Sequence, residues 1–198
     1  SPAPSSPAPT SPVPAPTGDA ITTVQLTNTT ASAQTNAAAT FGQVFAQGHV
    51  RNGETLVGRN AAGASVPLQV DVKARHADGS LRHAVITAQL ANSAANAVET
   101  ISLVKASAAA APAGTTPAAL LNNGLTAGLP ATLRRGADKA SADELLKSGK
   151  YTSWLSGALV NEWLVQAPLK NSAGVEHPHL MAQFAIRSYA GSNSARVD

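Results

Sequence analysis

Residues 66–90 constrain the fold more than any other stretch, because they form a pattern of two strands joined by one tight turn. Apolar and polar side chains alternate along 66–73, and 84–90 largely repeat this pattern. Period-two alternation is typical of a strand with one buried face. The connection 76–80 (HADGS) has a glycine where a short hairpin loop needs positive φ. The stretch therefore predicts an antiparallel hairpin, with Gln69, Asp71 and Lys73 on the polar face of its first strand.

Further short strands are predicted on both sides of this hairpin. They are rich in β-branched or apolar residues and lie at 20–26, 40–50, 55–57 and 100–104. The polar, alanine-rich stretch before Thr40, residues 28–40, is expected to form a loop. Short strands separated by turn residues are typical of antiparallel barrels and sandwiches. We therefore expect a small β-barrel domain over residues 19–105.

The rest of the chain predicts three further segments. Residues 1–18, rich in proline, alanine and serine, are expected to be an extended spacer. Residues 106–150 are interpreted as a linker with one short helix at 142–148, begun by a capping box of Ser141 and Glu144. Strand patterns return at 158–165 and 180–189, so residues 151–198 are expected to begin a second, incomplete β-rich domain.

Composition and missing motifs argue against several functions. The net charge is only +3 with no run of like charges, which gives no support to a nucleic-acid partner. Because the chain has no cysteine, disulfides and thiolate metal sites are excluded. No stretch has the roughly 20 apolar residues of a membrane span. With no nucleotide-binding, hydrolase or zinc-protease motif, we expect no catalytic residue and no cofactor.

The most polar part of the hairpin is its turn. Asp78, Gly79 and Ser80 are interpreted as turn residues: the carboxylate accepts backbone hydrogen bonds and the glycine takes positive φ. The alternative is a site in which His76, Arg82 and His83 contact an acidic sugar. The turn interpretation is preferred, and the glycan contact is kept as an alternative.

Two other groups of residues were weighed as sites. His177 and His179, two positions apart, could bind a metal only with a third ligand such as Glu162 or His49. We prefer a proline-stiffened turn there and predict no metal site. Trp154 and Trp163 are interpreted as packing residues within a core or between domains, with glycan contact as the alternative.

Several stretches resemble known proteins. Residues 42–48, 66–86 and 184–198 resemble the amino-terminal part of exo-rhamnogalacturonan-lyase-like proteins. This resemblance implies a small RIFT-related β-barrel followed by a β-rich domain, with catalysis further along the chain, so it assigns no catalytic residue here. The runs at 154–169 and 177–180 are similar to large tail proteins of bacteriophages.

These observations lead to one functional expectation and one alternative. Because the chain starts without methionine and a strand pattern begins at 196–198, we expect a piece of a longer protein. It is expected to be a structural, connecting module of a phage tail or tail fibre, located in the virion or at a cell surface. It would dock to neighbouring chains, as a homo-oligomer or in a virion, and position a distal receptor-binding region. The alternative is the non-catalytic amino-terminal region of a polysaccharide lyase, or a module that binds cell-surface glycan.

Overall fold

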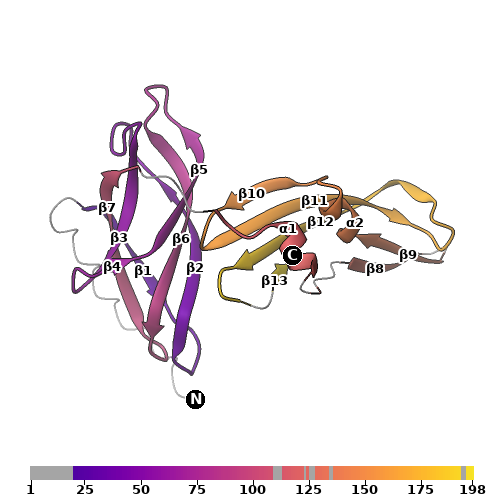
Figure 1. Ribbon diagram of the computed structural model, residues 1–198, viewed down its shortest axis with the longest axis horizontal. Coiled ribbons are helices and arrows are strands. Elements are labelled where there is room, and N and C mark those ends of the chain that lie inside the picture. The colour runs from indigo at the N-terminus through magenta and orange to yellow at the C-terminus, as the bar shows by residue number, and fades with distance from the viewer. Residues whose placement is uncertain (1–19, 109–112, 123, 125–127, 134–135, 193–194) are drawn as a thin grey trace, which may run out of the picture.

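The computed structural model describes residues 20–108, 113–122, 124, 128–133, 136–192 and 195–198 (Figure 1). The chain is mainly β, with two short helices among the described residues, which confirms the expected fold class. The predicted spacer at 1–18 lies outside the described residues.

Two sheets form the first β unit, at the left of Figure 1. The four-stranded sheet has the order β1-β7-β3-β4 and the three-stranded sheet the order β2-β6-β5. Their strands are β1 (Ala20–Thr27), β2 (Gln34–Val44), β3 (Glu54–Asn60), β4 (Ser65–Val66), β5 (Leu68–Arg75), β6 (Leu81–Ser93) and β7 (Val98–Ser107). Only Pro67 separates β4 from β5, so the chain passes from one sheet to the other at this residue. All pairings within the two sheets are antiparallel.

A single apolar cluster fills the space between these two sheets. Its inward-facing residues follow the period-two pattern: Ala84, Ile86 and Ala88 of β6 are fully buried, as are Ile101 and Leu103 of β7. The rest of the buried cluster is Phe45, Val50, Leu56, Val66 and Leu81. The alternation in the sequence therefore predicts correctly which side of β6 faces the core, whereas Val72, on the apolar side of the preceding strand, is 43% exposed.

The predicted hairpin is present as β5 and β6. Leu68 pairs with Ala88 and Val70 with Ile86, and the register shifts between Val72 and Arg75. In the loop, the amide of His76 donates to the carbonyl of Ser80 at 2.8 Å.

Two predictions in this unit are wrong, and the first is the strand expected at 40–50, which ends at Val44. Residues 28–40 were expected to be a loop, but β2 begins at Gln34 and pairs with β6 from Gln34–Ser93 to Val44–His83. Many side chains of β2 are half-buried or exposed, so its sequence of alanines and polar residues shows little alternation of apolar and polar positions. The strand forms because the backbone of β6 offers a full ladder of hydrogen bonds.

The second unit is built around one sheet with the order β13-β12-β11-β9-β8, and β10 pairs with β11. Its elements are α1 (Pro117–Asn122), β8 (Gly128–Leu133), β9 (Gly136–Ser141), α2 (Asp143–Lys147), β10 (Thr152–Ser156), β11 (Val160–Lys170), β12 (Glu176–Tyr189) and β13 (Ala195–Val197). The core consists of Ala140, Ala142, Leu146, Trp163, Val165, Ala167, Leu169, Ala182, Phe184 and Ile186. The first unit and this sheet therefore have separate cores.

The predicted linker 106–150 differs most from the structure. It contains the β8–β9 hairpin, which joins the second sheet through β11, and the helix α1, which the sequence did not predict. The helix predicted at 142–148 is present as α2, which is shorter than expected, and the predicted capping box is absent. Ala142 is the N-cap residue, the Ser141 hydroxyl accepts from the Asp143 amide at 3.4 Å, and Glu144 pairs with Lys147 at 2.9 Å. Because Ser141 still belongs to β9, it lies one residue too early to cap α2.

Candidate functional site at the contact between the two units

The polar face of β5 contacts residues 154–160, which run from β10 through the turn to the start of β11. Gln69 lies at the centre of this contact. Its Oε1 accepts from the amides of Leu159 and Val160 at 2.9 and 3.0 Å, and its Nε2 donates to the Val160 carbonyl at 2.9 Å. The second Nε2 proton goes to Asp71 Oδ2 at 2.8 Å. Every donor and acceptor of this carboxamide is therefore used, and the partners fix its orientation.

Asp71 and Lys73 continue the contact along the same face of β5. Asp71 Oδ1 accepts from the amide of Ser156 at 2.9 Å. The ammonium of Lys73 donates to the Trp154 carbonyl and lies 4.2 Å from the centre of the Trp154 ring, as in a cation–π contact. Gln69, Asp71 and Lys73 alternate along one strand, so they reach three successive parts of segment 154–160.

Gly157 is required by this arrangement. A Cβ atom at this position would lie 2.5 Å from the carboxamide carbon of Gln69, closer than atoms can approach. Asn161 holds the same glycine by donating to its carbonyl at 2.9 Å and accepting from its amide at 3.3 Å. The turn between β10 and β11 is therefore shaped to receive the Gln69 side chain.

A second connection between the units runs through Tyr189 of β12. Its hydroxyl lies 3.2 Å from Oγ1 of Thr40 in β2, and this oxygen also bonds the buried hydroxyl of Thr87 at 2.8 Å. Arg187 is bonded to Tyr189 and to Glu162. Burial acts to lower the pKa of Arg187, but the hydrogen bonds to Glu162 and Tyr189 outweigh it and hold the pKa above its usual range.

Apolar burial accompanies these polar contacts. Leu155 and Val160, which lie on both sides of the Gly157 turn, are fully buried. Neither belongs to the core cluster of the first unit or to that of the second. The contact thus combines a saturated set of hydrogen bonds with side chains removed from water, which is what a fixed orientation between two units requires.

The predicted turn residues lie outside this contact. Asp78 Oδ1 accepts from the amide and hydroxyl of Ser80 at 3.0 and 2.6 Å, and Gly79 has φ of 81°. The hydroxyl of Ser80, which is buried, accepts from the Gly48 amide at 3.0 Å. The Ser80 hydroxyl, followed by its amide, holds the pKa of Asp78 below its usual range. These residues therefore join the hairpin loop to the segment after β2.

The predicted glycan-contact residues do not form one group. His76 has a ring nitrogen 3.0 Å from the Phe45 carbonyl, Arg82 is exposed, and His83 is half-buried on β6. Trp154 is 41% exposed, and the ammonium group of Lys73 lies over its ring. Trp163 was interpreted first as a packing residue, and it is 4% exposed within the core of the second unit, where protein covers its ring.

The remaining candidates offer no assembled metal site. His177 and His179 have ring centres 6.3 Å apart, and a ring nitrogen of His177 accepts from the amides of His179 and Leu180. Glu162, weighed as a third ligand, pairs with Arg187 instead. Among the residues that the structure describes, no group of three metal-ligating side chains was found, and no helix has the length and apolar character to cross a membrane.

Sequence reasoning missed the role of Gln69, Asp71 and Lys73. The sequence pattern places these three residues on the polar face of one strand, but it does not predict which part of the chain packs against that face. One signal was available: a glutamine, an aspartate and a lysine at alternate positions can all bond backbone groups, and 154–161 contains a glycine between two strand patterns. The sequence does not show that these two stretches, more than 80 residues apart, meet.

Comparison with known proteins identifies the first unit. Residues 22–103 match the family model of the PcRGLX-like N-terminal RIFT barrel domain. The match runs from β1 into β7 and contains the β5–β6 hairpin, so the expected RIFT-related barrel is confirmed for this part of the chain. The matched residues are fewer than half of the chain, and the assignment applies to the barrel. No curated protein matches this chain in sequence.

Proposed function

We propose that this chain is a connecting module that holds a RIFT barrel and a second β sheet in one fixed orientation. The observation that carries the proposal is the carboxamide of Gln69, which bonds the backbone of Leu159 and Val160 with both its oxygen and its nitrogen. Backbone groups have fixed positions, so a side chain that bonds three of them permits little rotation between the units. A connection of this kind transmits orientation from one part of a protein to the next.

Spin-label distance measurements test this proposal. The chain contains no cysteine, so Val98→Cys and Val175→Cys introduce the only two labelling sites, at residues that are 54% and 61% exposed. A fixed contact gives one narrow distance distribution. Adding Gln69→Ala is expected to broaden it, whereas Gln25→Ala, at an exposed position of β1, is the matched control and leaves it unchanged. A broad distribution in the parent protein would contradict the proposal.

The wider setting that we propose is a phage tail or tail fibre, in which the module docks to neighbouring chains and positions a distal receptor-binding region. The support for this setting is the similarity of residues 154–169 and 177–180 to phage tail proteins. The same run supplies the Gly157 turn that receives Gln69. Mass spectrometry of purified virions tests the setting, which requires peptides of this chain among the structural proteins. A longer reading frame with an α/α-barrel and a Tyr/His/Lys/Arg cluster would instead favour an accessory region of a polysaccharide lyase.

A second candidate function is glycan binding by the second unit. A groove of about 470 Å³ in the second unit is lined by the aromatic residues Tyr151 and Trp154 and by Gln166 and Gln183. Aromatic rings stack on the apolar faces of sugars, and amide side chains bond vicinal hydroxyls. A glycan array tests this candidate, and Gln166→Ala is expected to remove any signal. The labelled distance would not change in that variant, so the two functions can be separated.

A further inference from the structure

The connection between β2 and β3 ends in a tight turn that carries an Asn-Gly pair. The amide of Glu54 donates to the carbonyl of Arg51 at 3.0 Å, which closes the turn, and Asn52 and Gly53 lie at its tip. Both tip residues are exposed, and Gly53 has φ of 83°. The turn takes no part in the contact made by Gln69, so it is separate from the proposed connecting function.

Two groups of this pair are free to move toward each other. In the described part of the chain, neither the carboxamide of Asn52 nor the backbone amide of Gly53 has a hydrogen-bond partner. Glycine has no Cβ, so its backbone rotates at little cost and its amide nitrogen approaches a neighbouring carbon atom without steric hindrance. The carboxamide carbon of Asn52 is therefore open to attack by the nitrogen that follows it in the chain.

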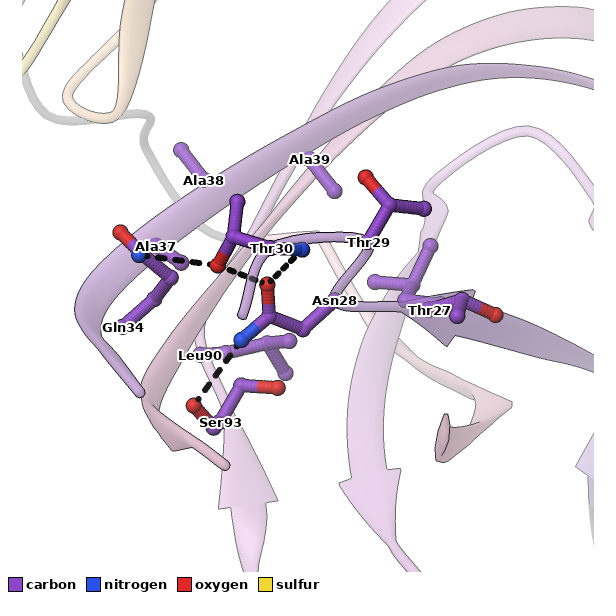
Figure 2. A pocket seen from close by; sticks show the side chains of 11 residues that line it. Thr27, Asn28, Thr29, Thr30, Gln34, Ala37, Ala38, Ala39, Leu90 and Ser93 are labelled. Carbon is purple, nitrogen blue, oxygen red and sulfur yellow. Dashed lines mark hydrogen bonds between the residues drawn. The ribbon is translucent and has the colours of Figure 1, made fainter. Parts of the chain in front are cut away.

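Hydrogen bonds hold the carboxamide of other asparagines in place. Oδ1 of Asn28 accepts from the amide and hydroxyl of Thr30 at 3.0 and 2.7 Å, and its Nδ2 donates to the Ser93 carbonyl at 3.3 Å (Figure 2). Oδ1 of the exposed Asn171 accepts from two backbone amides at 3.0 and 2.9 Å. A carboxamide bonded in this way has to break these bonds before it can turn toward the next residue.

The residue that follows the asparagine separates Asn52 from a second exposed position. Asn36 is exposed, and its carboxamide also has no partner among the residues that the structure describes. The next residue is Ala37, whose Cβ restricts the backbone rotation that Gly53 permits. A further Asn-Gly pair occurs in the sequence at 123–124, where Asn123 lies outside the described residues. Asn52 is thus exposed, unbonded and followed by glycine.

We propose that Asn52 is a site of self-modification, converted to aspartate and isoaspartate by attack of the Gly53 nitrogen. This nitrogen gives its proton to hydroxide and forms a bond to Cγ of Asn52. The bond from Cγ to Nδ2 breaks, and Nδ2 takes a proton from water and leaves as ammonia. Water then opens the resulting succinimide ring. Cleavage between the nitrogen and Cγ gives aspartate, and cleavage between the nitrogen and the main-chain carbonyl carbon gives isoaspartate. One water is consumed and one ammonia released, with no oxidation or reduction.

The modification changes both the charge and the backbone of the turn. Each product adds a carboxylate beside the β5–β6 loop, since a Cβ atom placed on Gly79 would lie 3.8 Å from Cβ of Asn52. In isoaspartate the main chain runs through the side-chain carbons, so one more carbon atom separates Arg51 from Glu54. The hydrogen bond that closes the turn then loses its geometry.

Incubation of the full chain at neutral and at mildly alkaline pH tests the proposal. Trypsin, which cleaves after lysine and arginine, releases peptide 52–59, in which Asn52 is the only asparagine. Mass spectrometry is expected to show the mass increase of an NH2 group replaced by OH, at a rate that rises with hydroxide concentration. An isoaspartate methyltransferase is expected to label the same peptide. Asn36 and Asn171 are expected to stay unmodified over the same time.

Asn52→Gln is the matched control, because a longer side chain has to close a larger ring. This variant is expected to lose the mass increase and the methyltransferase labelling. In the modified parent, the amide NMR signals of Glu54 and Gly79 are expected to shift, and they should stay constant when the variant is incubated in the same way. Thermal unfolding checks that the variant keeps the fold of the parent.

Three results would overturn the proposal. One is a peptide 52–59 that gains no mass. Another is conversion of Asn36 at the same rate as Asn52, because that would show that Gly53 contributes nothing. The third is aspartate as the only product, because direct hydrolysis of the carboxamide bypasses the succinimide ring. Unchanged NMR signals of Glu54 and Gly79 in the modified protein would contradict the effect on the turn.

Discussion

At the scale of single residues, Gln69 and Gly157 depend on each other. A Cβ atom at Gly157 would lie 2.5 Å from the Gln69 carboxamide. Gly157→Ala should therefore lower the free energy of unfolding by about 1–3 kcal/mol, a typical cost of overpacking. In a Gln69→Ala background the clash disappears, so the same substitution should cost less than about 1 kcal/mol. A double-mutant cycle measured by urea unfolding checks this coupling, and additive effects would contradict it.

Asp78 gives a second prediction at this scale, concerning pH. Its carboxylate has a lowered pKa because the Ser80 hydroxyl and amide bond to it. A group with a lowered folded pKa contributes stability that is fully present above its unfolded pKa and is lost as the pH falls through the folded pKa. Asp78→Asn should thus lower the urea midpoint at pH 7 and differ less from the parent below about pH 4. A constant difference at every pH would count against this role.

At the scale of elements, one ion pair joins β11 to β12 next to the contact between the units. Glu162 is opposite Arg187 in the register, and their side chains are 5% and 25% exposed. Glu162→Ala should cost about 1–3 kcal/mol, because it leaves a half-buried guanidinium with fewer partners. Glu176→Ala removes the exposed pair with Lys170 and is the matched control, with an expected cost below about 0.5 kcal/mol. If Glu162→Ala and Glu176→Ala lowered the thermal stability equally, burial of the Glu162–Arg187 pair would not increase its contribution, which would contradict this prediction.

The elements that could be predicted from sequence are those whose own side chains carry a periodic pattern. β5 and β6 alternate over many residues, and the buried side of β6 follows from that alternation. β2 and the β8–β9 hairpin could not be predicted, because their pairing with β6 and β11 depends on distant backbone groups and not on local composition. The Gln69 contact was missed for the same reason: its partners are 90 and 91 residues away and are backbone atoms, which every sequence has.

At the scale of the whole molecule, the barrel and the second sheet have separate cores. Whether the two units unfold together therefore depends on the contact between them. In the parent chain this contact includes three hydrogen bonds between Gln69 and the backbone of Leu159 and Val160, and the bond from Ser156 to Asp71. We therefore expect the parent to unfold in a single calorimetric transition. Two independent units would melt separately even in the parent, which would contradict a fixed connection.

The variant Gln69→Ala with Asp71→Ala tests whether these two side chains couple the cores. It leaves the amides of Ser156, Leu159 and Val160 without their side-chain acceptors. The expected loss is about 2–5 kcal/mol of coupling, since each net hydrogen bond contributes about 0.5–1.5 kcal/mol. Calorimetry should then show two transitions, one for the barrel and one for the second sheet. Gln25→Ala should keep the single transition of the parent. If the double variant also unfolds in one step at a lower temperature, the coupling must come mainly from Tyr189 and the buried Leu155 and Val160.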